Sequence, residues 1–70
     1  MARFVRNDFS YHGTYLTYCG HFIARFKYQP RTRGRFMTFL IKNFTVEEYL
    51  GFLDMGESPL GALRLKGYAL

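Results

Sequence analysis

Hydrophobic and polar residues alternate through the first half of the chain, as in β-strands that bury one face. Residues 15–18 and 21–28 are two such runs, and Cys19-Gly20 between them has the length and the glycine of a tight hairpin turn. A two-residue turn fixes which side chains share a face. The face predicted to be core carries Tyr15, Thr17, Phe22, Ala24, Phe26 and Tyr28. The opposite, outer face carries Leu16, Tyr18, His21, Ile23, Arg25 and Lys27.

Two further segments are predicted to extend this sheet. Residues 35–42 have an alternate set, Met37, Phe39 and Ile41, that is wholly apolar, which predicts a third strand after a turn-rich connection over residues 29–34. Residues 1–12 mix aromatic and charged side chains and are compatible with an additional N-terminal edge strand.

The second half of the chain carries helix signals. Thr45-Val46-Glu47-Glu48 has the spacing of a capping box, and the apolar residues that follow recur at helical spacing until Gly56. A second, short helix is predicted with Ser58 as its N-cap, Pro59 at its first position and Gly67 after its end. The sequence thus predicts a single small domain, residues 1–70, of the α+β class. A three-stranded antiparallel meander, with the possible extra edge strand, would pack against one helix and the short second helix.

Composition points to a binding protein with an acidic partner. The net charge of +5 and the pI near 9.7 favour nucleic acid, an acidic protein or nucleoprotein surface, or anionic lipid. The apolar runs are too short to span a bilayer, so no membrane-spanning segment is expected and the membrane is not counted among the partners. The single cysteine, Cys19, has no partner for an intrachain disulfide, which fits a soluble protein of the reducing cytoplasm.

The candidate binding residues lie on the predicted outer face and in the connection beside it. Arg31, Arg33 and Arg35 stand out because guanidinium groups match phosphate oxygens, although a solvated basic face is the simpler alternative. The apolar members of this face would have to be covered by residues 1–12, by a second copy of the chain or by a partner protein. The full set is His21, Ile23, Arg25, Lys27, Arg31, Arg33, Arg35, Phe36, Leu40 and Lys42.

No group of residues in the sequence predicts catalysis, a metal site or a cofactor. Cys19 and His21 are close in sequence, but no third residue is placed to orient them as nucleophile and base. His12 and His21 lack further ligands at a recognisable metal-binding spacing.

Three segments resemble, in order, the strands and helix of ethylene-response-factor DNA-binding domains, an architecture shared by integrase N-terminal domains. They are GHFIARF from Gly20, Arg35-Phe36, and FTVEE from Phe44, and they cover about half of the chain. The resemblance implies a three-stranded sheet laid in the DNA major groove and read by His21, Ile23, Arg25, Lys27 and Arg35. The strand tryptophans of that family are absent, the helix is shorter, and the link from Arg35 to Thr45 is longer.

Residues 55–59 and 62–67 resemble the turn and second helix of repressor-type helix-turn-helix proteins. In those proteins the residue after the turn glycine is usually apolar, whereas here it is Glu57. A helical hairpin that closes the core is the alternative interpretation.

These observations favour a non-enzymatic module that binds nucleic acid through a basic sheet face and the Arg31–Arg35 loop. The alternative is a small inhibitor or adaptor of the phage type, used against host defence as anti-CRISPR proteins are, that binds a host protein or nucleoprotein through the same surface. A homodimeric structural protein is a third possibility.

Overall fold

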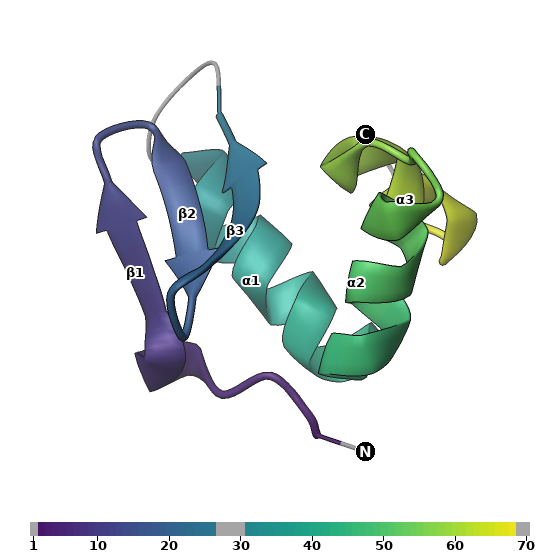
Figure 1. Cartoon of the computed structure of the whole chain (residues 1–70), viewed down its shortest axis with the longest axis horizontal. Helices are drawn as coiled ribbons and strands as arrows, with labels where there is room; N and C mark the ends of the chain where they lie inside the picture. The colour runs from purple at the N-terminus through teal and green to yellow at the C-terminus, as the bar shows by residue number, and fades with distance from the viewer. Residues whose placement is uncertain (1, 27–30, 69–70) are drawn as a thin grey trace.

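The computed structural model describes residues 2–26 and 31–68, with the backbone alone for residues 31–33, and it has an α+β fold (Figure 1). The short 3-10 helix η1 (Arg6–Asp8) precedes a sheet of strands β1 (Phe9–His12), β2 (Tyr15–Tyr18) and β3 (His21–Arg25). Helices α1 (Arg31–Asn43), α2 (Val46–Asp54) and α3 (Pro59–Leu65) follow. The predicted class is confirmed, since a three-stranded antiparallel sheet is combined with helices.

The sheet is a meander in the order β1-β2-β3, and both of its connections are two-residue turns. Cys19 and Gly20 both have positive φ, 49° and 84°, as a tight hairpin turn with the native twist requires. The predicted hairpin at Cys19-Gly20 is therefore confirmed. The possible N-terminal edge strand is also present, as β1.

A β-bulge in β3 breaks the strict alternation from which the faces of the sheet were predicted. Thr17 pairs with Phe22 but Leu16 pairs with Ala24, so Ile23 is an extra residue in β3. The bulge lets consecutive residues 23 and 24 both face the core, and their exposed fractions are 1% each.

The whole of β2, together with Phe22 and Ile23, lies on the opposite face from the one predicted, whereas Ala24 and Arg25 beyond the bulge lie on the faces predicted for them. Leu16 and Tyr18 are buried, whereas Phe22, predicted as core, is 58% exposed. Burial and ring contacts put Tyr15 and Arg25 on the open side with Phe22. The prediction that Leu16, Tyr18 and Ile23 lie on the outer face was wrong.

Residues 35–42 belong to α1, so the predicted third strand at this position was wrong. Phe36 and Leu40 are four residues apart and both fully buried, which is the spacing of one helix face. Arg35 and Lys42 lie on the solvent side of the same helix. The predicted turn-rich connection was likewise wrong over residues 31–34, which form the first turn of α1; residues 29 and 30 lie outside the described residues.

The N-terminal segment packs on the helix side of the sheet and joins it to α2 (Figure 1). Phe4 is 3% exposed, and its ring contacts the rings of Phe9, Tyr18 and Tyr49. The Val46 amide donates to the Ala2 carbonyl at 2.8 Å. The face that was predicted to be outer, which carries Leu16, Tyr18 and Ile23, is therefore covered in part by residues 2–8 and otherwise by the helices, whereas the opposite face of the sheet stays open.

Helices α2 and α3 begin and end where the sequence predicts. The Thr45 hydroxyl accepts the Glu48 amide at 3.0 Å, and the Ser58 hydroxyl accepts the Gly61 amide at 3.0 Å. The Glu48 carboxylate, however, pairs with Lys66 at 2.7 Å, so only the hydroxyl half of the capping box is present.

The core lies between the sheet and the three helices. Its buried side chains are Phe4, Leu16, Tyr18, Ile23, Ala24, Phe26, Phe36, Leu40, Phe44, Tyr49, Ala62 and Leu63. Ala62 and Leu63 of α3 are part of this core, so α3 turns back beside α2, and the two helices form a helical hairpin that closes the core (Figure 1). Within the described residues, no helix is long and apolar enough to cross a membrane.

Candidate nucleic-acid interface

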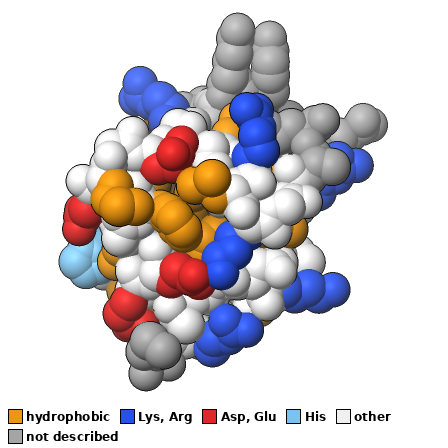
Figure 2. All heavy atoms as spheres, turned by 90° about the vertical axis from the view of Figure 1, so that its right-hand side faces the viewer, with side chains coloured by type: hydrophobic (Ala, Val, Ile, Leu, Met, Phe, Trp, Pro, Cys, Tyr) orange, Lys and Arg blue, Asp and Glu red, His pale blue; other side chains and the backbone are white. Residues whose placement is uncertain are grey.

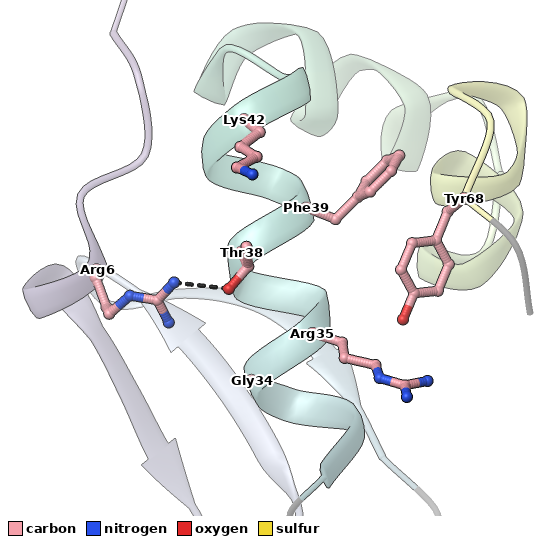
Figure 3. Close-up of a pocket in the computed structure, with 7 residues that line it drawn as sticks. All are labelled: Arg6, Gly34, Arg35, Thr38, Phe39, Lys42 and Tyr68. Atoms are coloured by element: carbon pink, nitrogen blue, oxygen red, sulfur yellow. Dashed lines mark hydrogen bonds between the residues drawn. The ribbon is translucent and has the colours of Figure 1, made fainter.

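A groove beside α1 brings together basic and aromatic side chains from distant parts of the chain (Figure 3). We call it the α1 groove. Its floor and sides come from α1, one edge comes from η1, and the other comes from the segment after α3. Its lining residues are Arg6, Gly34, Arg35, Thr38, Phe39, Lys42 and Tyr68.

The helical repeat of α1 explains which polar residues reach this groove. Arg35, Thr38 and Lys42 recur at spacings of three and four, so they form a stripe along one side of the helix. Phe36 and Leu40 are fully buried on the core side of the same turns. The burial of one apolar face therefore presents this basic stripe to solvent.

Side-chain hydrogen bonds tie the N-terminal segment to the groove. The Arg6 guanidinium donates to the Thr38 hydroxyl at 2.8 Å, as the dashed line in Figure 3 shows. The Arg3 guanidinium donates to the Lys42 carbonyl at 3.3 Å. Arg6 is thus held at the edge of the groove with donors of its five-donor guanidinium still available.

Aromatic rings form the wall opposite Arg6. The Phe39 and Tyr68 rings meet edge to face, with centroids 4.8 Å apart. The Tyr68 amide donates to the Leu63 carbonyl at 3.0 Å, which fixes Tyr68 against the end of α3.

The positive charges of the groove are not balanced by carboxylates of the described residues that line it. No carboxylate of the described residues lines it, and the one ion pair among them is Glu48–Lys66, outside the groove. The charges are also unevenly distributed along the chain, because residues 1–46 hold eight of the ten Lys and Arg but one of the five acidic residues. A positive potential is therefore concentrated on the part of the protein that contains the sheet and α1.

The open face of the sheet is a second, separate surface, and it shares no lining residue with the α1 groove. A shallow depression there is lined by Tyr15, Thr17, Gly20, Phe22 and Arg25. The Tyr15 and Phe22 ring centroids are 5.7 Å apart, and the guanidinium carbon of Arg25 is 5.8 Å from the centroid of Tyr15. We call these five residues, together with Ser10 and His12, the outer sheet face.

The sequence-predicted site residues fall into several groups. Arg35 and Lys42 meet in the α1 groove, whereas Arg25 lies on the outer sheet face and His21 is exposed at the start of β3. Three residues cannot contact a partner because they are in the core, and their predicted place on an exposed face was wrong: Ile23, Phe36 and Leu40. The backbone of Arg31 and Arg33 lies in the first turn of α1, and Lys27 lies outside the described residues.

Several residues of both surfaces were missed by the sequence reasoning. Tyr15 and Phe22 were assigned to the core because the bulge was not foreseen. Arg6 and Thr38 were not considered, although the helical spacing of Arg35, Thr38 and Lys42 was available as a signal.

Comparison with known proteins gives no match to any family model, to any curated protein or to any solved structure. The functional inference therefore rests on the surfaces of this chain.

Proposed function

We propose that this protein is a non-enzymatic nucleic-acid-binding module whose phosphate-binding surface is the α1 groove. The observation that carries the proposal is the convergence of Arg6, Arg35 and Lys42 on one groove that no carboxylate of the described residues lines. Similar charges placed together repel each other, and a polyanion removes that cost.

The side chains of the groove suit the parts of a nucleic-acid backbone. Guanidinium groups bind phosphate oxygens in a fork, and the Lys42 ammonium adds a point charge. The Thr38 hydroxyl is a further hydrogen-bonding group, and the Phe39 and Tyr68 rings offer an apolar surface for sugars.

The start of α1 adds support from its charge pattern. The first turn of α1 contains no acidic residue, whereas Arg31 and Arg33 lie within it. Positive residues at this end oppose the helix dipole and cost stability, which a bound phosphate offsets. This arrangement favours the predicted role of the Arg31–Arg35 segment in binding an anion.

Removal of charge from the groove tests the proposal. A labelled oligonucleotide is titrated with wild-type protein and with the double variant Arg35→Gln, Lys42→Gln, and binding is followed by fluorescence anisotropy at low salt. Both side chains are exposed, so the fold is expected to survive, which circular dichroism checks. The matched control is the double variant Arg64→Gln, Lys66→Gln, which also removes two positive charges, from the exposed end of α3.

The proposal predicts that the groove variant binds more weakly, whereas the Arg64→Gln, Lys66→Gln variant retains nearly all of the wild-type affinity. Equal losses in both variants would indicate attraction by net charge alone. Wild-type protein that does not bind at low salt would refute the proposal outright.

A specific observation also favours the second candidate, a small inhibitor or adaptor of the phage type that binds a host protein. Figure 2 shows hydrophobic side chains gathered in the middle of the face that lies at the right of Figure 1, where α2 and α3 lie, with charged groups around them. The exposed large hydrophobic residues of this region are Met55, Leu60 and Leu65, exposed by 75%, 42% and 62%. Such a patch is typical of a protein-docking surface.

The two candidates are separated by different substitutions. Under the inhibitor hypothesis, Leu65→Asp abolishes capture of one defined host protein, and nuclease treatment does not release that protein. The Arg35→Gln, Lys42→Gln variant then still captures it. The opposite pattern supports nucleic-acid binding through the α1 groove.

A further inference from the structure

The outer sheet face has a composition that an ordinary solvated sheet face lacks. Phe22, on the edge strand β3, is 58% exposed, and no described element covers it. The three strands contain no acidic residue, whereas Arg25 and two histidines are exposed on them. The exposed ring of Phe22 beside the cation of Arg25, on strands that contain no carboxylate, requires a physical explanation.

The strand register sets these groups in two rows across the sheet. Ser10, Thr17 and Phe22 are successive cross-strand neighbours in one row, and His12, Tyr15 and Arg25 are neighbours in the next. The rings of His12 and Tyr15 have centroids 6.1 Å apart, and those of Tyr15 and Phe22 are 5.7 Å apart. The bulge at Ile23 brings Phe22 and Arg25 onto the same face, since without it residues 22 and 25 would point to opposite sides.

We propose that the outer sheet face binds the unpaired bases of a single-stranded nucleic acid, by stacking on Phe22 and Tyr15 while Arg25 contacts a neighbouring phosphate. Stacking on aromatic rings beside a basic group is how single strands bind protein surfaces without sequence selection. The inference rests on the proposed function, and it adds the class of nucleic acid that is bound.

Other occupants fit this face less well. A double helix keeps its bases stacked on one another and offers no ring to Phe22. A second copy or a protein partner needs a broad apolar patch, but Phe22 is the one exposed large hydrophobic side chain on the three strands, and its row across the sheet continues with the polar residues Thr17 and Ser10.

The test uses oligonucleotides of about ten nucleotides, within the site size of small single-strand binders. Oligo(dT) and oligo(U) supply the bases in DNA and RNA form. An abasic oligomer of the same length and charge and a duplex of matched sequence serve as controls. Because the chain contains no tryptophan, Phe22→Trp places a single fluorescent reporter on the face while it retains a stacking ring.

The proposal predicts that oligo(dT) or oligo(U) quenches the tryptophan emission of the Phe22→Trp variant, whereas the abasic oligomer does not. Phe22→Ala then lowers affinity for the base-containing single strand by roughly 5- to 150-fold, the effect of losing one stacked base, and leaves affinity for the abasic oligomer unchanged. Circular dichroism checks that the exposed substitution leaves the fold intact.

Two results overturn the inference, and they differ from each other. Equal binding of base-containing and abasic oligomers, with Phe22→Ala neutral for both, refutes stacking but leaves phosphate binding in the α1 groove intact. No binding of any oligomer by wild-type protein refutes the proposed function and this inference together.

Discussion

Replacement of Gly34 by alanine tests the assignment of α1 by the sign of a stability change. Gly34 lies in the first turn of α1 without a positive φ, and an added Cβ would meet no heavy atom within 4 Å. Glycine inside a helix costs roughly 0.5–1 kcal/mol relative to alanine, because the unfolded chain loses more conformational freedom on folding. Since nothing clashes, Gly34→Ala is expected to raise the free energy of unfolding by about that amount.

The gain is measurable in a chain of this size. A change of about 1 kcal/mol shifts Tm by roughly 4–8 °C in domains of 60–100 residues, so the expected rise is roughly 2–8 °C. Thermal and urea unfolding, followed by circular dichroism, measure it. Gly56→Ala is the matched control, because Gly56 has φ +88° and an alanine there is strained by about 1–2 kcal/mol.

The two substitutions should therefore move stability in opposite directions. If Gly34 instead had a positive φ within the turn-rich connection that the sequence pattern predicts, both variants would be destabilised. A fall in Tm for Gly34→Ala would refute the assignment of this segment to α1.

Three further substitutions test the packing and the caps. Burial raises the pKa of the Tyr49 phenol above its ordinary value of 10.0, so the folded state holds this proton more tightly than the unfolded state, and stability present below about pH 10 is lost as pH rises further. The Tyr49 hydroxyl has no partner among the described residues, so Tyr49→Phe should raise the free energy of unfolding by about 1 kcal/mol. In urea unfolding the variant should also lose less stability than the wild type between pH 8 and pH 11. Equal pH profiles would contradict this. Thr45→Ala removes the cap of α2 and should cost about 1 kcal/mol in urea unfolding, and no cost would contradict the cap. Lys66→Met removes the pair with Glu48, which is partly exposed, and should cost less than about 1 kcal/mol; if raised salt leaves the difference from wild type unchanged, the pair contributes nothing.

The parts of the fold that were predictable from sequence depend on short-range chemistry. Cys19-Gly20 gave the hairpin turn because positive φ favours glycine there. Ser58 and Pro59 gave the start of α3 because an N-cap hydroxyl and a first-position proline act within a few residues.

The segment that became α1 was misassigned because its apolar run satisfies two periods. Met37, Phe39 and Ile41 alternate as a strand would, but Phe36 and Leu40 are also spaced as one helix face. A short run that is apolar on consecutive positions does not distinguish a strand from a buried helix, so packing against the sheet decides. Whether this segment is a helix or a strand also decides whether the α1 groove exists, because helical spacing brings Arg35 and Lys42 to the same side.

The outer sheet face could not be predicted because it depends on one inserted residue. The bulge at Ile23 exchanges the two faces of β3 beyond that point, and no sequence signal in residues 21–25 marks it. The rings of Tyr15 and Phe22 were therefore assigned to the core, and Ile23 was assigned to the surface. A strand that contains two consecutive buried residues is visible only once the helices that cover it are placed.

The most direct test of the central claim is the salt dependence of affinity for an oligonucleotide, compared between wild-type protein and the Arg35→Gln, Lys42→Gln variant. Phosphate binding in the α1 groove predicts that the logarithm of the wild-type binding constant falls linearly with the logarithm of salt concentration. The slope should be shallower in the variant by about one unit for each lost phosphate contact. Absence of binding at low salt, affinity that does not change with salt, or the same slope in both proteins would contradict the account.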